Sequence, residues 1–366
     1  MRHRGRVRIL AIIGVAVLAT FGVAALTVAV RNRRYAKMSR LHLVLRAQQE
    51  GVLVFSAPQL GALLTERGEE EIYIQIVRHV LAEGTGAETV RAISLGPQEI
   101  TVQTRASDQD DLTRQGQAIK DLLVELFPDA ELLSSDMIPI TVQDLESVRG
   151  ILRERLRAYG MGRSVVEAQP PDRVLVEVPL RDPEKASPLA TPSGSLLLKK
   201  TALLEFRAVP RRYAHDDRRP EQRETAGRPV FTFREPTGME VPTSQVITES
   251  PVVLAGRDIE PNSARVVYNP NQATAVVFEL TQQAAEKLED FTRRNIGRFV
   301  AVVLDGEMIA CPIIEKPIPG GEVQISGGFD GRGGLQRAQD LKILLNAGAL
   351  PVELEYTESR VVQPSE

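Results

Sequence analysis

The chain has 366 residues, of which 43% are hydrophobic and 25% charged, and these fractions are typical of a globular protein. Residues 1–40 carry nine Lys and Arg side chains and no acid, which leaves 36 basic and 48 acidic side chains, a net charge of −12, on the rest. That negative body argues against nucleic-acid binding, which needs a basic face. The single cysteine, Cys311, excludes an internal disulfide and a multi-cysteine metal site.

The N-terminal region predicts a membrane anchor. The run from Ile9 to Val30 has no charged side chain, and as a helix it reaches about 33 Å, enough to cross a hydrocarbon core of about 30 Å. A cleaved signal peptide is the alternative, but its apolar stretch is usually about 7–15 residues long and a cleavage site follows it. We expect one uncleaved span with a basic flank near anionic lipid headgroups. Basic residues on its two sides nearly balance, so charge alone does not orient it.

Residues 41–137 are predicted to form a first α+β module, because helical and strand patterns alternate there. Its expected elements are a strand at 41–45, a helix at about 69–81, strands at 90–94 and 99–104, and a helix at about 110–126.

Residues 138–209 are predicted to form a ferredoxin-like base module. Thr141 can cap a helix in which Asp144 occupies the reciprocal capping position, and Gly160 ends that helix. A strand pair at 164–168 and 173–178, a short or broken helix within 182–200 and a strand at 202–208 follow. With a strand before it, this α-β-β-α-β order is the split βαβ arrangement.

The C-terminal half divides into an excursion and a head. Residues 210–246 are rich in Arg, acids and Pro, which predicts an exposed segment with one edge strand at 231–233. Residues 247–356 are predicted to be an α+β head, and 357–366 a tail. The head should contain strands at 265–268, 275–280, 298–304, 308–314, 322–325 and 352–356, a tight Asp305-Gly306 turn, and helices that begin at Thr281 and about Leu335.

No catalytic, cofactor or metal site is predicted. His42, His79 and His215 are isolated in the sequence, so no metal site is expected. The glycine-rich stretch 326–334 lacks the lysine and hydroxyl of a phosphate-binding P-loop, and close approach of two backbones explains its glycines better. The Asp-Gly turn explains Asp305 without a catalytic role. We therefore expect no enzyme.

From Asp144 onward the chain resembles the first large extracytoplasmic domain of the SecD family, auxiliary subunits of the Sec protein translocase. The first matching stretches are LESVRGILRERLRAYGM, VVEAQPPDRVLVEVPLRDPEKA and LLLKKTALLEFRAV. More specific is the order of the Asn295-Ile296-Gly297 helix end, the Leu304-Asp305-Gly306 hairpin, the Ala310-Cys311-Pro312 strand, the Ser326–Phe329 turn and the Ala347–Pro351 exit. The resemblance covers about two-thirds of the chain and implies a base and a head.

The resemblance also implies a topology and partners. It places the N-terminus in the cytoplasm and the body outside the inner membrane, and it implies contact with the Sec translocon and unfolded preproteins. Two departures are expected to matter. Residues 37–41 replace an Asp-Leu-Lys-Gly-Gly-like stretch, and the chain ends at Glu366 before the family's five further membrane helices. We expect a SecF-like or SecD-like membrane partner to carry those proton-conducting helices.

The sequence thus predicts a single-pass, SecD-like accessory protein of Sec-dependent export that captures translocating preprotein outside the membrane. The alternatives are an envelope scaffold that has lost the export role and an enzyme whose site assembles from dispersed residues. Capture should use apolar grooves or strand edges. No motif names a binding residue, and the predicted substrate contacts lie in the head: Phe329, Ile313, Ile314, Pro317 and Ile318.

Overall fold

The computed structural model describes residues 39–60, 73–81 without 75 and 79, 90–180, 198–214, 219–225, 228–269, 272–326, 329 and 333–362. These residues form a mixed α+β protein whose paired strands are all antiparallel. The predicted span Ile9 to Val30 and most of the helix expected within 182–200 lie outside the described residues. Within the described ranges, no helix has the length and apolarity to cross a membrane.

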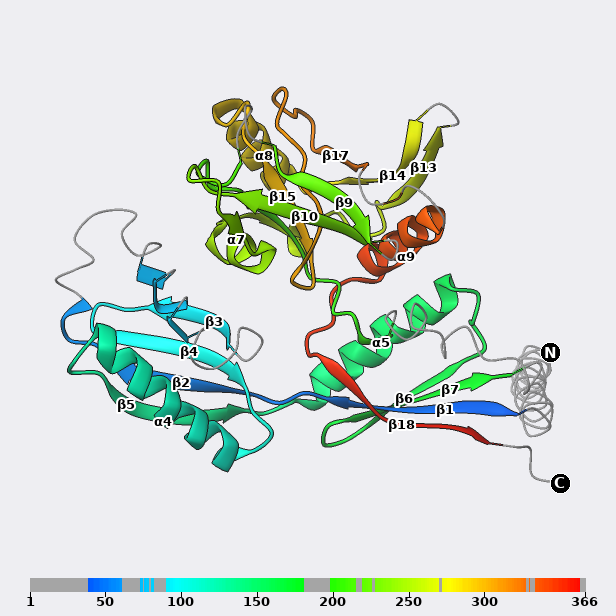
Figure 1. Cartoon of the computed structure of the whole chain (residues 1–366). Coiled ribbons are helices and arrows are strands. Elements are labelled where there is room, and N and C mark those ends of the chain that lie inside the picture. The colour runs from blue at the N-terminus through cyan, green and yellow to red at the C-terminus, as the bar shows by residue number, and fades with distance from the viewer. Residues whose placement is uncertain are drawn as a thin grey trace, which may run out of the picture.

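The base is a four-stranded sheet covered by one helix. Strands β1 (Arg40–Ala47), β6 (Val165–Gln169), β7 (Arg173–Pro179) and β18 (Leu354–Val362) adopt the order β18-β1-β7-β6, with α5 (Val142–Ala158) on one face (Figure 1). Leu41, Leu43 and Leu45 alternate along β1 into the core that α5 covers. The predicted capping box is present, because Thr141 accepts from Asp144 N and Asp144 accepts from Thr141 N.

Two strand assignments made from the sequence are corrected. The strand expected at 202–208 is present as β8 (Leu204–Ala208), but it pairs with β12 (Val252–Ala255) and β15 (Val300–Leu304), not with the base. The base sheet is instead completed by β18, an edge strand that pairs with β1, although the sequence placed 352–356 in the head and 357–366 in a tail. Strand pairing depends on tertiary packing, so neighbours in the sequence were poor guides.

The first module repeats the topology of the base. Strands β2 (Glu50–Ser56), β3 (Val90–Leu95), β4 (Glu99–Arg105) and β5 (Glu131–Ile138) adopt the order β3-β4-β2-β5, and α4 (Gln109–Leu126) packs on them. Residues 73–74, 76–78 and 80–81 are helical, as expected, and Val77 and Leu81 join its core. The chain order β-α-β-β-α-β with this strand order is the ferredoxin-like arrangement, placed between β1 and α5.

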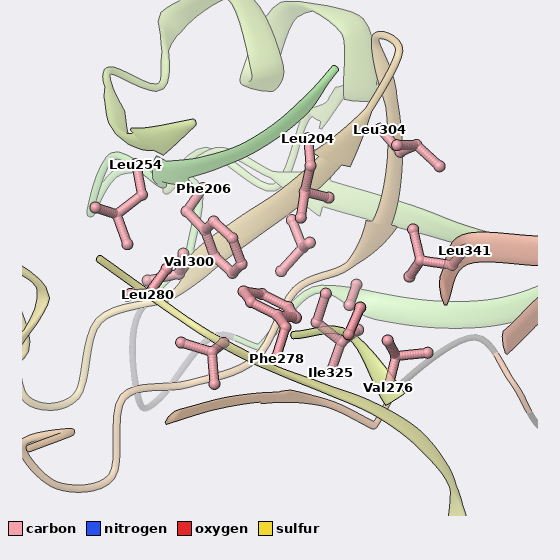
Figure 2. Close-up of a cluster of buried hydrophobic side chains, with 14 of the residues drawn as sticks. Leu204, Phe206, Leu254, Val276, Phe278, Leu280, Val300, Leu304, Ile325 and Leu341 are labelled. Atoms are coloured by element: carbon pink, nitrogen blue, oxygen red, sulfur yellow. The ribbon is translucent and has the colours of Figure 1, made fainter. Parts of the chain in front are cut away.

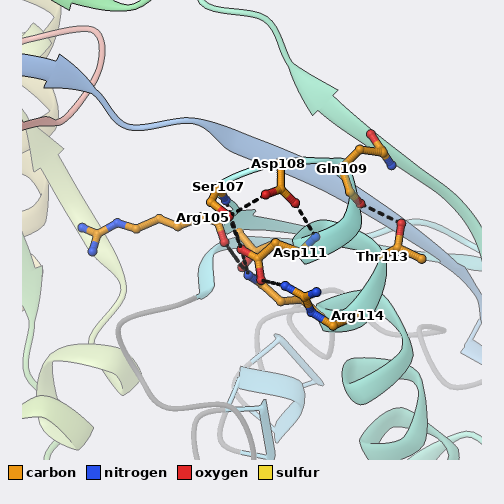
Figure 3. Close-up of polar contacts among 9 residues, drawn as sticks. Arg105, Ser107, Asp108, Gln109, Asp111, Thr113 and Arg114 are labelled. Atoms are coloured by element: carbon orange, nitrogen blue, oxygen red, sulfur yellow. Dashed lines mark hydrogen bonds and ion pairs between the residues drawn. The ribbon is translucent and has the colours of Figure 1, made fainter.

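Local chemistry fixes the start of α4 (Figure 3). Asp108 is its N-cap and accepts from Asp111 N at 2.8 Å. Asp111 in turn accepts from Ser107 N at 3.0 Å, and this hydrogen bond lowers the pKa of the Asp111 carboxyl. The bond to Asp108 satisfies a backbone N–H group that the first turn of a helix leaves without a partner, and the bond from Ser107 fixes the residue before the cap.

The head contains two sheets that enclose a core (Figure 2). One sheet has the strand order β12-β8-β15-β16, in which β16 is Glu307–Ala310. The other sheet has the order β13-β14-β17. Its strands are β13 (Arg265–Asn269), β14 (Gln272–Glu279) and β17 (Glu322–Ile325). Phe206 and Phe278 meet across this core with ring centroids 6.1 Å apart. Helices α8 (Gln282–Arg294) and α9 (Gly334–Ala347) add Leu288 and Leu341 to it.

A second core lies on the other face of β15. All five residues of this strand are buried, because Val300, Val302 and Leu304 face the first core while Ala301 and Val303 face the second. The second core is completed by side chains from β10 (Arg228–Arg234), β11 (Glu240–Val241) and α7 (Thr243–Glu249), with β9 (Glu221–Thr225) beside β10: Phe231, Phe233, Val241 and Val246. The segment expected to be an exposed excursion therefore supplies a buried aromatic strand.

A buried arginine joins the connections between base and head. Arg155 of α5 donates from Nη1 to Lys200 O at 2.5 Å, and from Nη2 to Thr201 O at 3.3 Å and to Gly348 O at 3.0 Å. The segment that leads from the base to the head also pairs directly with the segment that returns from the head, since Leu350 N donates to Thr201 O at 2.8 Å. Burial lowers the pKa of Arg155 to about 10. An arginine is rarely buried without partners, and here backbone carbonyls supply them.

Candidate functional site

The predicted substrate contacts are mostly interior residues. Phe329 and Ile314 are buried in the first head core, and Ile318 packs against that core. Ile313 packs against the second core, on the other side of the sheet, and Pro317 is half-buried. The structure therefore brings Ile314, Ile318 and Phe329 to one core but separates Ile313 from them. Their role in binding stays a prediction.

The segment that carries Ile313–Pro319 is also held by backbone hydrogen bonds. Ile314 N donates to Arg298 O at 2.8 Å, Gly297 N donates to Ile314 O at 2.8 Å, and Ile318 N donates to the Thr292 hydroxyl at 3.0 Å. These contacts satisfy the backbone groups that would otherwise pair with an incoming chain. Side chains exposed elsewhere in the head are better placed for direct contact.

The glycine-rich stretch 326–334 brings two backbones together, as the sequence indicated. A Cβ on Gly334 would overlap the carbonyl oxygen of Phe329, so α9 can begin here only with glycine. Residues 327, 328 and 330–332 lie outside the described residues. The close approach accounts for Gly334 without a bound phosphate.

Strand β13 is an edge strand of the β13-β14-β17 sheet, and its outer edge pairs with no described strand (Figure 1). Val267 and Tyr268 are 41% and 68% exposed, respectively. Just before the strand, the Asn346 side chain accepts from Ala264 N and donates to Ala264 O, both at 2.9 Å. Backbone groups alternate in direction along a strand. The N–H group of Val266 should therefore point to the same side as that of Ala264, whereas the pairing with β14 becomes irregular between Val267 and Asn269.

An acidic cleft of about 870 Å³ lies between the loop before β13, the end of β14 and α8. Four glutamates line it, Glu260, Glu279, Glu286 and Glu289, together with Asn262, Gln282 and Gly320 among others. No local sequence pattern indicates this cleft, since its acids come from three separate segments. Among the described residues, no group of three or more His, Cys, Asp or Glu side chains is arranged to hold a metal.

The cysteine has the environment of an unreactive thiol. Cys311 packs against the second head core, and burial raises the pKa of its thiol to about 12. Only the thiolate is a good nucleophile or metal ligand. This side chain is therefore not suited to catalysis at neutral pH.

The chain is similar to protein translocase subunits. Residues 231–352 match the family model of the SecDF P1 head subdomain. A SecD translocase subunit of Acidaminococcus fermentans is 29% identical over 216 residues, which are 59% of this chain and 39% of that protein. The SecD subunit of Syntrophobacter fumaroxidans is 28% identical over 273 residues, which are 69% of this chain and 49% of that protein. The chain thus spans less than half the length of either relative.

A solved structure, the crystal structure of SecDF in a super-membrane-facing form, is also similar. The aligned region is 27% identical in sequence and covers 61% of this chain and 29% of the SecDF chain. The TM-score is 0.46.

Proposed function

Because the chain contains a P1 region of the SecD family, we propose that it is an accessory component of Sec-dependent protein export. It is anchored by residues 9–30 in the inner membrane, with its N-terminus in the cytoplasm and its body outside. Its partners are the Sec translocon, a SecF-like or SecD-like membrane subunit and unfolded preproteins. The relatives are named as translocase subunits, and this chain carries out no catalytic step.

The outer edge of β13 carries the proposal, as the place where an extended preprotein segment is held. A strand edge offers main-chain hydrogen bonds to any sequence, and this generality suits a protein that handles many substrates. The exposed Val267 and Tyr268 add apolar contact beside those backbone groups. Asn346 fixes the strand's start from α9, so the edge is preorganised. The hold is passive and reversible, and hinders backsliding of the emerging chain.

The test uses the full chain in detergent and a labelled peptide of alternating valine and threonine residues, which favour the extended conformation. The double variant V267S/Y268S should weaken binding about tenfold, which corresponds to a loss of about 1.4 kcal/mol. The matched control is V230S/V252S, which alters two valines of the head that are 44% and 43% exposed on other strands. The control should bind within about twofold of the unaltered chain. Equal binding by both double variants would place capture somewhere other than β13.

A further inference from the structure

Two arginines next to the loop after α8 form a positively charged spot on the head. Arg298 donates from Nη1 to Asn295 Oδ1 at 2.7 Å and from Nη2 to Val209 O at 3.4 Å. Its Nε is buried and has no hydrogen-bond partner among the described residues. Arg211 is exposed and makes no ion pair within the described part of the chain. Neither guanidinium contacts a described carboxylate.

The positive charges of these two arginines repel each other, and a bound anion would offset that repulsion. Burial and the positive charge of Arg211 together lower the pKa of Arg298, so the charged form of Arg298 is destabilised where it stands. Other arginines nearby do have acidic partners: Arg212 pairs with Glu249, Arg293 with Glu289, and Arg294 with Asp290. In a body with a net charge of −12, two adjacent arginines without one indicate a site for a negative group.

An exposed apolar side chain lies in the same loop. Ile296 is 52% exposed two residues before Arg298, and Gly297 between them has a φ of +80° that turns the chain sharply. Positive φ at Gly297 is inexpensive because glycine has no Cβ. A bound inorganic anion would leave Ile296 in water, whereas an acidic protein segment could cover it.

We infer that Arg211, Ile296 and Arg298 form a docking site for an acidic segment of a partner protein. A carboxylate of that segment accepts from the two guanidiniums, a geometry that arginine favours, and a neighbouring apolar side chain packs on Ile296. A lipid headgroup fits the position less well, because Arg40, which follows the predicted span, begins β1 of the base while this site lies in the head. The site shares no residue with the β13 edge, so it does not depend on the proposed function.

The experiment measures binding of a labelled peptide of alternating glutamate and leucine residues to the full chain in detergent. The peptide should bind, its glutamine counterpart should bind at least about tenfold more weakly, and added salt should weaken the first more than the second. R211Q should weaken the glutamate peptide about fivefold, while R211K should retain most of the affinity. R211Q is preferred to R298Q as the test, because Arg211 is exposed, whereas R298Q would remove the hydrogen bonds of Arg298 to Asn295 and Val209.

Three outcomes would overturn the inference. One is equal binding of the glutamate and glutamine peptides, and another is unchanged affinity in R211Q. A third is displacement of the peptide by inorganic phosphate or by vesicles of anionic phosphatidylglycerol as effectively as by unlabelled peptide.

Discussion

Arg155 and Gly348 are joined by a hydrogen bond of 3.0 Å although 193 residues separate them in the chain. The guanidinium of Arg155 reaches the segment that returns from the head, and its other contacts, to Lys200 and Thr201, hold the segment that leaves the base. A single buried side chain thus connects the two chain segments that link the base and the head. Its removal would leave three carbonyls without these partners.

Arg155→Leu should therefore lower the free energy of unfolding by about 2–4 kcal/mol, because buried acceptors that lose their donors are costly. Arg155→Lys should recover little of this loss, since an ammonium group cannot span three carbonyls as the guanidinium fork does. Denaturant unfolding of the full chain in detergent measures both. Arg153→Leu, on the exposed face of the same helix, is the control and should change stability by less than about 0.5 kcal/mol.

Gly334→Ala should destabilise the head by at least about 2 kcal/mol, because the new methyl group overlaps the Phe329 carbonyl and the backbone must shift. The matched control is Gly150→Ala in α5, where an added Cβ meets nothing within 4 Å. In a helix interior that change should stabilise by about 0.5–1 kcal/mol. Opposite shifts of the melting temperature are expected, and a shift of the same sign in both would contradict the close approach.

Gly306→Val should cost about 1–3 kcal/mol through backbone strain. Asp305 and Gly306 both have positive φ, +51° and +78°, which confirms the predicted tight turn. The turn also contacts the segment that leads from the base to the head. There the Asp305 carboxylate accepts from Leu203 N at 2.9 Å and from the Thr201 hydroxyl. Gly306→Asn, which tolerates positive φ better, should lose clearly less stability in the same thermal melt.

Acid should weaken the starts of α4 and α5. Hydrogen bonds from Thr141 lower the pKa of Asp144, as the backbone N–H of Ser107 does for Asp111. A carboxyl whose pKa is lower in the folded state stabilises the fold above its unfolded pKa, and this contribution is lost as pH falls through the folded value. D111N/D144N should therefore reduce the loss of stability between about pH 5 and 2. The exposed E167Q change should leave that loss unaltered.

The molecular mass of the mature protein tests the predicted anchor. If residues 9–30 stay attached, protein extracted from membranes should retain its N-terminal region, because the apolar run is longer than that of a signal peptide. Mass spectrometry of the intact, membrane-extracted chain measures this. A mature N-terminus after Ala25 would show that the run is a cleaved signal.

Much of the local structure was predictable because its causes are close together in the sequence. The Thr141–Asp144 box, the helix over 110–126 and the strand at 231–233 all depend on residues within a few positions of each other. The candidate site was less predictable. Phe329 and Ile314 are apolar, and apolar residues serve a core and a binding surface equally well in the sequence; only packing showed that both are buried.

The sequence by itself determined the α+β class, the turn at Asp305-Gly306, the caps of its helices and the likeness to SecD, because short-range backbone preferences and residue order carry that information. Only the tertiary structure decided that β1 pairs with β18, where Arg40 lies opposite Val362, 322 positions further along the chain, and that β8 belongs to the head. The same holds for the exposed edge of β13 and for the arginines at 211 and 298. Strand partners, burial and unpaired charges arise from contacts between distant segments, and alternation of apolar residues fixes which face of a strand is buried but not which neighbour it meets.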